Sequence, residues 1–344
     1  MFKKITDTLP GLAAALAIAA VATFIESLLP IHIIGAAVIA MFIGMAFEPL
    51  VKKTPIMAKG IKFTSKRVLK CAIILLGLSL NITTVLTVGR MSLIVMLFTL
   101  ATCFGGGYFV GKALGLNWKT SNLISAGTGI CGGSAIAALS TTIDADDTDI
   151  AYAMSATFLF DMAMIVLFPI MGRALGMSDE AFGLWAGTAV NDTSSVVATG
   201  YAFSEGAGDF ATMVKLTRTL AIIPTVLTFA LIQMCIKRKE AMASSGNADG
   251  IKADFSLKKI FPFFILGFLA MATVASVFPI PATVVSLTKK ISKFLMVSAL
   301  AAIGMNTSFS HLKKTGARPM LHGFIISVLV VVVALLVEMW MGLV

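Results

Sequence analysis

Apolar residues follow one another along this chain in long blocks that short polar stretches separate. The blocks are about 20 residues long, which is the length that an α-helix needs to cross a ~30 Å hydrocarbon layer. The pattern predicts an all-α polytopic membrane protein with about 11 transmembrane helices. We place these helices at residues 10–29, 32–48, 68–86, 92–114, 121–143, 149–172, 180–203, 209–236, 260–279, 284–304 and 319–341.

Composition supports this interpretation. Hydrophobic residues make up 58% of the 344 residues and charged residues only 13%, whereas a soluble domain has roughly 25% charged residues. A water-soluble fold is therefore excluded. The net charge of +10 does not indicate nucleic-acid binding, because the basic residues lie in short loops between apolar blocks and report on topology instead.

Basic residues gather in every second loop, which predicts a cytoplasmic N-terminus and a C-terminus on the periplasmic or extracellular side. The acidic loop at 144–149 and the loop with Arg90 are then external. We expect one transmembrane domain over residues 1–344, with helical groups at 1–236 and 260–344 joined by a cytoplasmic loop at 237–259. The basic loops are 49–67, 112–120, Arg173, 237–259 and 311–318.

Two polar, glycine-rich interruptions occur inside apolar blocks. Ala126–Ser134 (AGTGICGGS) aligns without gaps with Ala186–Ser194 (AGTAVNDTS), and transporter folds are often built from repeats that meet at the substrate site. Inverted repeats should run in opposite directions, but one span lies between these two blocks, so full crossing makes them parallel. Either one block is a re-entrant hairpin or the likeness reflects shared chemistry; we prefer full crossing because it keeps Arg173 inside and the acidic loop outside.

Irregular backbone at membrane depth survives only where protein packs on it or where it lines a wet cavity. A helix broken at either interruption directs the N-terminus of its second half, with free N–H groups and a positive dipole end, toward a ligand, which favours an anion. Close packing of small residues is the alternative for the glycines. The predicted substrate-binding residues are Thr128, Gly129, Gly132, Gly133, Ser134, Thr188, Asn191, Asp192, Thr193, Ser194 and Ser195.

Two carboxylates, Asp161 and Asp192, lie at the centres of predicted spans. Such groups are costly in a membrane and usually functional, so we expect them to bind a coupling H⁺ or Na⁺; an ordering hydrogen bond between helices is the alternative. Lys215 and Arg218 share one face of the next span. They are expected to neutralise an anion, to pair with the aspartates, or to reach the outer interface.

Neither a catalytic constellation nor a metal-ligand spacing is visible, so we expect no enzyme activity, no cofactor and no metal. The four cysteines lie inside or at the ends of apolar blocks, without a Cys-x-x-Cys pair, which is typical of small buried residues.

The segments Ser125–Ala138 and Gly187–Gly200, followed by Lys215-Leu-Thr-Arg218, resemble the YeiH family of bacterial inner-membrane proteins, often labelled sulfate exporters. The resemblance covers nearly the whole chain. It implies membership of the wider cation/proton antiporter and anion transporter group, with a core of crossing, interrupted helices. Gly132–Pro169 also resembles the corresponding part of bile-acid/sodium symporter-like proteins.

These observations favour a secondary transporter in the bacterial plasma membrane that moves a small anion, such as sulfate or a related sulfur oxyanion or sulfonate, together with H⁺ or Na⁺. The alternatives are a cation/proton antiporter and, in a different class, a passive channel or a non-transporting sensor. The expected partners are the anion, the coupling ion and the lipid bilayer, with a homodimer left open.

Overall fold

The computed structural model describes residues 8–28, 36–245, 263–306 and 316–344. Its helices are α2 (Leu9–Leu28), α3 (Ala36–Lys53), α4 (Pro55–Phe63), η1 (Thr64–Val68), α5 (Leu69–Leu76), η2 (Gly77–Ser79), α6 (Ile82–Ala101), η3 (Thr102–Gly106), α7 (Gly107–Ala113), α8 (Trp118–Ala126), η4 (Gly127–Cys131), α9 (Gly133–Thr142), α10 (Asp147–Ala174), α11 (Asp179–Ala189), α12 (Thr193–Phe203), α13 (Glu205–Leu220), α14 (Ile222–Ser245), α16 (Phe263–Val277), α17 (Ala282–Asn306) and α19 (Ala317–Trp340). η1, η3 and η4 are π-helical, and η2 is a 3₁₀ turn.

Every regular element in these described ranges is a helix, which confirms the predicted all-α class. In the part of the chain that the structure describes, five helical stretches are long and apolar enough to cross a membrane: Leu9–Leu28, Ile82–Ala113, Thr148–Ala174, Glu205–Lys239 and Ala317–Trp340. The total of 11 spans stays a prediction. The predicted loop positions 246–259 and 311–315 lie outside the described residues.

The block predicted as one span at 68–86 divides between two helices. The stretch from α4 to η2 ends at Ser79, and α6 begins at Ile82. Asn81 stands between them and caps α6, because its Oδ1 accepts the N–H of Thr83 at 2.9 Å. An Asn at this position satisfies an amide that the helix itself leaves without a partner.

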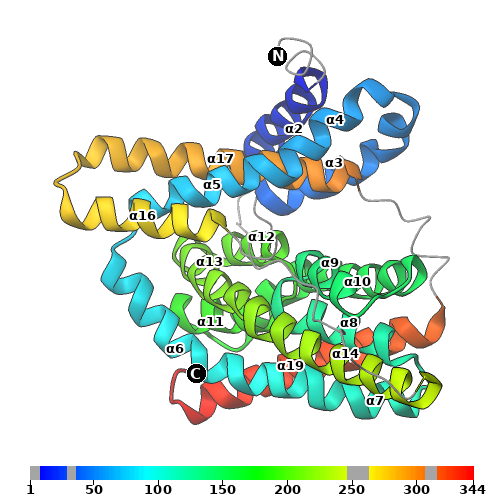
Figure 1. The fold of residues 1–344 in the computed structure, drawn as a ribbon. Helices are drawn as coiled ribbons and strands as arrows, with labels where there is room; N and C mark the ends of the chain where they lie inside the picture. The colour runs from blue at the N-terminus through cyan, green and yellow to red at the C-terminus, as the bar shows by residue number, and fades with distance from the viewer. Residues whose placement is uncertain (1–7, 29–35, 246–262, 307–315) are drawn as a thin grey trace.

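The helices form two spatial groups (Figure 1). The first, which we call the panel, contains α2, α3, the stretch from α4 to η2, α16 and α17. The second, which we call the core group, contains α6 to α14 and α19. The groups therefore interleave along the chain and do not follow the division into 1–236 and 260–344. Small residues hold the panel together: a side chain at Gly304 of α17 would overlap the carbonyl of Met41 on α3, and one at Gly44 would overlap the carbonyl of Ala301.

The segment from α8 to α9 is a hairpin that enters and leaves at the same end of the bundle. Lys119, at its start, donates to the carbonyl of Asp144, just past its end, at 2.6 Å. Thr120 also donates to Asp149 near the start of α10. A straight helix over these residues would separate its two ends by ~35 Å. The chain reverses at Gly132, whose φ of 65° suits glycine alone. We call this segment the first hairpin.

The segment from α11 to α12 is a second hairpin, and it enters from the other end. Arg173, before it, donates to the carbonyl of Ala202 near its close at 2.8 Å. A side chain at Gly206 would overlap the carboxylate of Asp179 at its start. α13 then packs parallel to α11 and antiparallel to α12, with Gly183 against Phe210 and Gly200 against Gly208.

α10 gives the scale of this arrangement. Its 28 residues extend ~42 Å at 1.5 Å per residue. The first hairpin accompanies the first half of α10, from Asp149 to Thr157, which faces Gly127. The second hairpin accompanies the other half, from Asp161 to Gly172, which packs on Phe182. Both hairpins thus reach only to the middle, from opposite ends.

This geometry corrects the expectation that both polar blocks cross fully. The acidic loop lies at the same end as Lys119 and Lys237, since Lys237 Nζ is 2.7 Å from Asp144 Oδ2. Arg173 lies at the other end. The prediction that placed the acidic loop opposite the loops of Lys119 and Lys237, and Arg173 on the same side as those loops, is therefore wrong. Hairpins that enter from opposite ends are inverted in orientation. The two aligned segments that start with Ala-Gly-Thr, which we call the AGT repeat, therefore run in opposite directions, as inverted repeats should. We call the end with Lys119 and Lys237 the basic end.

Candidate functional site

The tips of the two hairpins meet in the middle of the core group. A Cβ atom added at Gly132, in the first tip, would lie 2.8 Å from Oδ1 of Asp192, in the second tip. Glycine is needed here for two reasons, because the backbone has a positive φ and because the carboxylate comes this close. The alignment of Gly132 with Asp192 in the sequence repeat thus corresponds to a direct contact in space.

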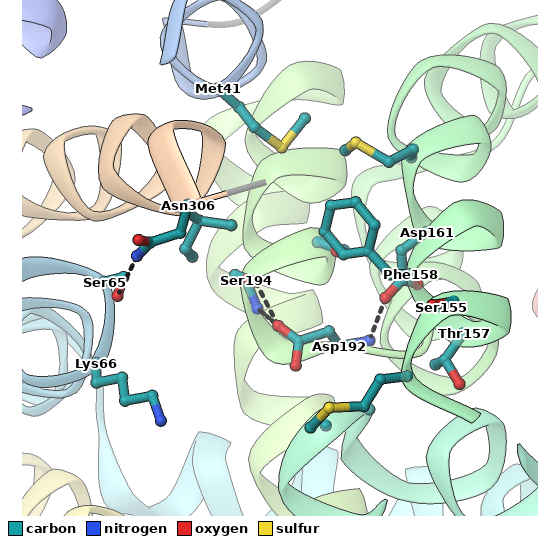
Figure 2. Close-up of a pocket in the computed structure, with 16 residues that line it drawn as sticks. Met41, Ser65, Lys66, Ser155, Thr157, Phe158, Asp161, Asp192, Ser194 and Asn306 are labelled. Atoms are coloured by element: carbon teal, nitrogen blue, oxygen red, sulfur yellow. Dashed lines mark hydrogen bonds between the residues drawn. The ribbon is translucent and has the colours of Figure 1, made fainter. Parts of the chain in front are cut away.

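Asp161 of α10 fixes the second tip. Its Oδ1 accepts the backbone N–H of Asn191 at 2.9 Å. Its Oδ2 accepts the backbone N–H of Asp192 at 3.0 Å, as Figure 2 shows. The side chain is 1% exposed. A carboxylate at the N-terminus of α12 satisfies free amides and compensates the positive dipole end. Asp161 is thus bound to backbone amides on both of its oxygens.

Asp192 is the N-cap of α12, and its Oδ2 accepts the backbone N–H of Ser194 at 2.9 Å and the hydroxyl of the same serine. Asn191, beside it, is fully buried and donates its amide to the carbonyl of Thr157 at 3.4 Å. Oδ1 of Asn191 has no partner within the described residues. The second tip therefore combines a capped helix start with one carboxylate oxygen directed at the other hairpin.

Arg218 of α13 lies outside the cavity lining and connects the two tips. It donates from Nε to the carbonyl of Gly129 at 2.7 Å, from Nη2 to that of Thr128 at 2.6 Å, and from Nη1 to that of Val190 at 3.0 Å. These carbonyls stand at the C-terminal ends of η4 and α11, where helices leave carbonyls without partners and carry a negative dipole end. The planar guanidinium has the fork of donors that such a bridge requires.

Lys215, one turn earlier on α13, binds the carbonyls of Val190, at 2.9 Å, and of Asn191. Its side chain is 0% exposed and that of Arg218 is 1% exposed. Of the three alternatives for these cations, the one that places them at the outer interface is therefore wrong. Their hydrogen bonds go to backbone carbonyls and not to Asp161 or Asp192.

A cavity of about 550 Å³ opens between the hairpin tips and the panel. Figure 2 shows Asp192 and Ser194 on one side of it and Ser65, Lys66 and Asn306 on the other. The cavity is lined by Met41, Ser65, Lys66, Gly132, Gly133, Met154, Ser155, Thr157, Phe158, Asp161, Met162, Asp192, Ser194, Ser195, Ile303 and Asn306.

The cavity lies on the basic-end side of the tips. Its lining residues on α10 run from Met154 to Met162, between the base of the first hairpin at Asp149 and the level of the second tip. Toward the other end, α12 packs directly on the panel, with Ala198 and Ala202 buried among apolar residues of α3 and α17. The space between panel and core group thus narrows on that side to small cavities, one of about 100 Å³ beside Ala202.

The structure brings about half of the sequence-predicted residues to this cavity: Gly132, Gly133, Asp161, Asp192, Ser194 and Ser195. Several of the others support the tips. Thr188 donates to the carbonyl of Leu184 in its own helix at 2.7 Å, and Ser134 bonds back to Cys131. Outside the lining lie Thr128, Gly129, Ser134, Thr188, Asn191, Thr193, Lys215 and Arg218.

Sequence reasoning missed the panel side of the cavity. Lys66 was counted among the cytoplasmic loop charges, yet it lies in the π-helical turn η1 and faces the hairpin tips. Asn306, at the end of α17, donates to Ser65 Oγ at 3.4 Å beside it. π-turns within helices often mark functional sites, but no sequence signal locates them. Within the described ranges, no three His, Cys, Asp or Glu side chains gather as a metal site.

Comparison with known proteins now identifies the family. The family model described as conserved hypothetical protein 698 matches residues 10–323. The chain belongs to this family. It is 55% identical over 327 residues to a UPF0324 membrane protein of Clostridium tetani, covering 94% of this chain and 95% of that protein. It is 42% identical over 342 residues to a UPF0324 membrane protein of Streptococcus pyogenes serotype M18, covering 97% and 98%.

These matches confirm the resemblance to the YeiH family and show a multi-pass membrane protein. Among solved structures, the sodium proton antiporter MjNhaP1 from Methanocaldococcus jannaschii at pH 8 aligns over 96% of this chain and 99% of its own, with 13% identity. The TM-score of 0.29 is too low for that likeness to carry an argument.

Proposed function

We propose that this membrane protein is a secondary active transporter that moves a small anion, coupled to H⁺ or Na⁺, by alternating access. The observation that carries the proposal is the meeting of two half-depth hairpins, from opposite ends, beside a cavity between panel and core group. Such a site lies at the membrane midplane, at the interface of repeats, and is reached from one end at a time. A sulfur oxyanion such as sulfate, or a sulfonate, is the proposed substrate class.

The first turn of α9 supports an anion. α9 starts at Gly132 without a side-chain cap, and Gly132 and Gly133 line the cavity. Backbone N–H groups and a dipole end of about +0.5 charge attract anions. Ser194 and Ser195 add hydroxyl groups, and Lys66 adds a positive charge across the cavity.

Asp192 is our proposed coupling residue. Both oxygens of Asp161 are held by amides of the second tip, whereas Asp192 directs Oδ1 toward Gly132 at the cavity. A proton or Na⁺ at Asp192 would remove the repulsion between its carboxylate and a nearby anion. Binding of the two would then be mutually favourable, as movement of both in the same direction requires.

A cation/proton antiporter is the second candidate, and one observation favours it. The carboxylates of Asp161 and Asp192 line the cavity, while Lys215 and Arg218 are turned away onto carbonyls. In that case the aspartates bind the transported cation directly. A passive channel or a sensor needs neither carboxylate to change its charge.

We also propose the orientation. The basic end faces the cytoplasm, by the rule that cytoplasmic loops are rich in Lys and Arg. α2 begins at this end, where Gly11 packs on Met57 and Gly60 of α4. α19 begins there as well, since Gly115 packs near Arg318, and it ends on the other side. The N-terminus is then cytoplasmic and the C-terminus external, in the bacterial plasma membrane.

The test uses purified protein in liposomes that contain a pH-sensitive dye, with sulfate, sulfite, a sulfonate or a carboxylate outside, and with or without Na⁺. Proton or Na⁺ flux that depends on the anion and is lost in Asp192→Asn supports the proposal. Asp144→Asn, an aspartate at the basic end, is the matched control and should transport normally. Cation flux without an anion requirement selects the antiporter, and downhill flux in both variants selects a channel.

A further inference from the structure

Four charged side chains connect the core group to the panel at the end opposite the cavity. Lys289 of α17 contacts Asp209 of α13 at 2.8 Å and Glu205 at 4.0 Å. Lys293, one turn further along α17, contacts Glu205 at 3.0 Å. We call these residues the ionic cluster.

The ionic cluster connects the core group to the panel, and does not connect helices within a single group. Glu205 and Asp209 lie in the first turns of α13, directly after the second hairpin, whereas both lysines belong to the panel. Tyr201 of α12 extends it, since its hydroxyl donates to Asp209 at 2.6 Å and its ring lies under Lys293, with Nζ 6.0 Å from the ring centroid.

The ionic cluster and the cavity lie at opposite ends of the interface between the panel and the core group. The cavity occupies the panel–core interface from the tips toward the basic end. On the other side α12 packs on α3 and α17 across the same interface, which there holds small cavities, and the cluster lies at the outer edge of that packing. Alternating access requires this packing to open when the solute leaves on the far side.

We propose that the ionic cluster is the gate that holds this protein in the conformation whose cavity faces the basic end. The inference rests on the proposed function, because it assigns the cluster a part in alternating access. When the second hairpin moves relative to the panel, Glu205 and Asp209 must separate from both lysines. The ion pairs are partly exposed, with side-chain exposures of 13 to 61%, so each gives a modest bias that a bound solute can overcome.

The experiment measures access to the cavity from each side. Ser155, which lines the cavity on α10, is changed to cysteine in a chain in which the exposed Cys71 and Cys235 are replaced by serine. A membrane-impermeant maleimide is applied to right-side-out and to inside-out vesicles. We expect labelling of the parent from the basic end alone, at a rate well above that of the chain without Ser155→Cys.

The gate variant is Lys289→Gln combined with Lys293→Gln. We expect labelling of Ser155→Cys from the opposite end to rise about tenfold, through the loss of pairs that each bias the equilibrium weakly. Lys289→Arg combined with Lys293→Arg, which keeps both positive charges, should retain the parent pattern. The matched control is Lys237→Gln, which breaks a 2.7 Å ion pair inside the core group at the basic end and should leave both rates unchanged.

Two results separate the failures. A parent labelled equally fast from both ends overturns the bias that we assign to the ionic cluster. The transport proposal fails separately, when the liposome assay shows no anion-dependent flux or shows downhill flux that Asp192→Asn leaves unchanged. A parent labelled from the basic end alone, with the same pattern in the gate variant, overturns the gate and leaves the transport proposal standing. The melting temperature of each variant in detergent shows whether a change in labelling reflects a loss of fold instead.

Discussion

Replacing Arg218 with glutamine should loosen the meeting point of the two hairpins. The guanidinium donates three hydrogen bonds, to the carbonyls of Thr128 and Gly129 in the first tip and of Val190 in the second. Val190 keeps Lys215 as a donor, and a glutamine amide can reach at most one of the remaining carbonyls. The variant therefore leaves one or two buried carbonyls without a partner and no longer connects the tips.

Hydrogen bonds from a charged donor contribute about 1.5 to 3 kcal/mol each, so losing two costs ~3 to 5 kcal/mol once the easier desolvation of glutamine is allowed for. A loss of that size lowers a melting temperature by about 5 to 10 °C in a chain of this length. Scanning fluorimetry in detergent, without any solute, measures the shift. Arg218→Lys keeps the positive charge but not the planar fork of donors. We expect its melting temperature to recover less than half of the loss seen in Arg218→Gln.

Thr217→Ala is the matched control, because the Thr217 hydroxyl bonds only within its own helix, to the carbonyl of Met213 at 3.3 Å. Its melting temperature should stay within about 1 °C of the parent, as for most substitutions away from buried networks. If Arg218→Gln melts like the parent, the guanidinium does not hold the tips, and the argument for its supporting part is refuted. If Arg218→Lys restores full stability, charge alone matters and the bridging geometry does not.

Three further predictions address other contacts. Gly132→Ala should abolish solute flux and lower the melting temperature, because its Cβ would approach Asp192 Oδ1 to 2.8 Å at a positive φ. Flux assays and fluorimetry measure the two effects, and normal flux would contradict the contact between the tips. Gly304→Val should destabilise the protein by overlapping the carbonyl of Met41, and an unchanged melting temperature would show that α3 and α17 separate at little cost. The nearby lysine of α14 lowers the pKa of Asp144, so the small contribution of this carboxylate to stability is present above the usual Asp pKa of about 3.9 and is lost as the pH falls through its lowered value. Asp144→Asn should therefore differ from the parent at pH 7 and converge with it in acid, as melting curves at both pH values will show.

The sequence was enough to predict the helical class and the two interruptions. Apolar block length predicted the all-α membrane class, and the run around Asn191 and Asp192 marked the second tip. The hairpin topology could not be obtained in this way. A hairpin with two half-depth arms and one crossing helix both take about 25 apolar residues, so hydropathy alone gives the same pattern for each.

The contacts of the tips were also beyond sequence reasoning. The partners of Lys215 and Arg218 are backbone carbonyls, and a carbonyl group has no side-chain signature. Lys66 was interpreted as a loop charge because it stands in a run of basic residues near a predicted span end. One signal for the hairpins was available: full crossing makes the two segments of the AGT repeat parallel, whereas inverted repeats run in opposite directions. We gave more weight to the charge of the acidic loop, which favoured full crossing.

Two half-depth hairpins that meet beside a cavity would shorten the distance over which the membrane voltage falls at their tips. In the proposed transporter, water that fills the cavity from the basic end would carry the potential of that end up to Asp192, and nearly all of the voltage would fall between this residue and the opposite end. A charge that crosses the whole voltage gains or loses about 2.3 kcal/mol per 100 mV. An ion that reaches Asp192 from the basic end crosses little of it. Membrane voltage would then act on the movement of the loaded tips and hardly on the binding step.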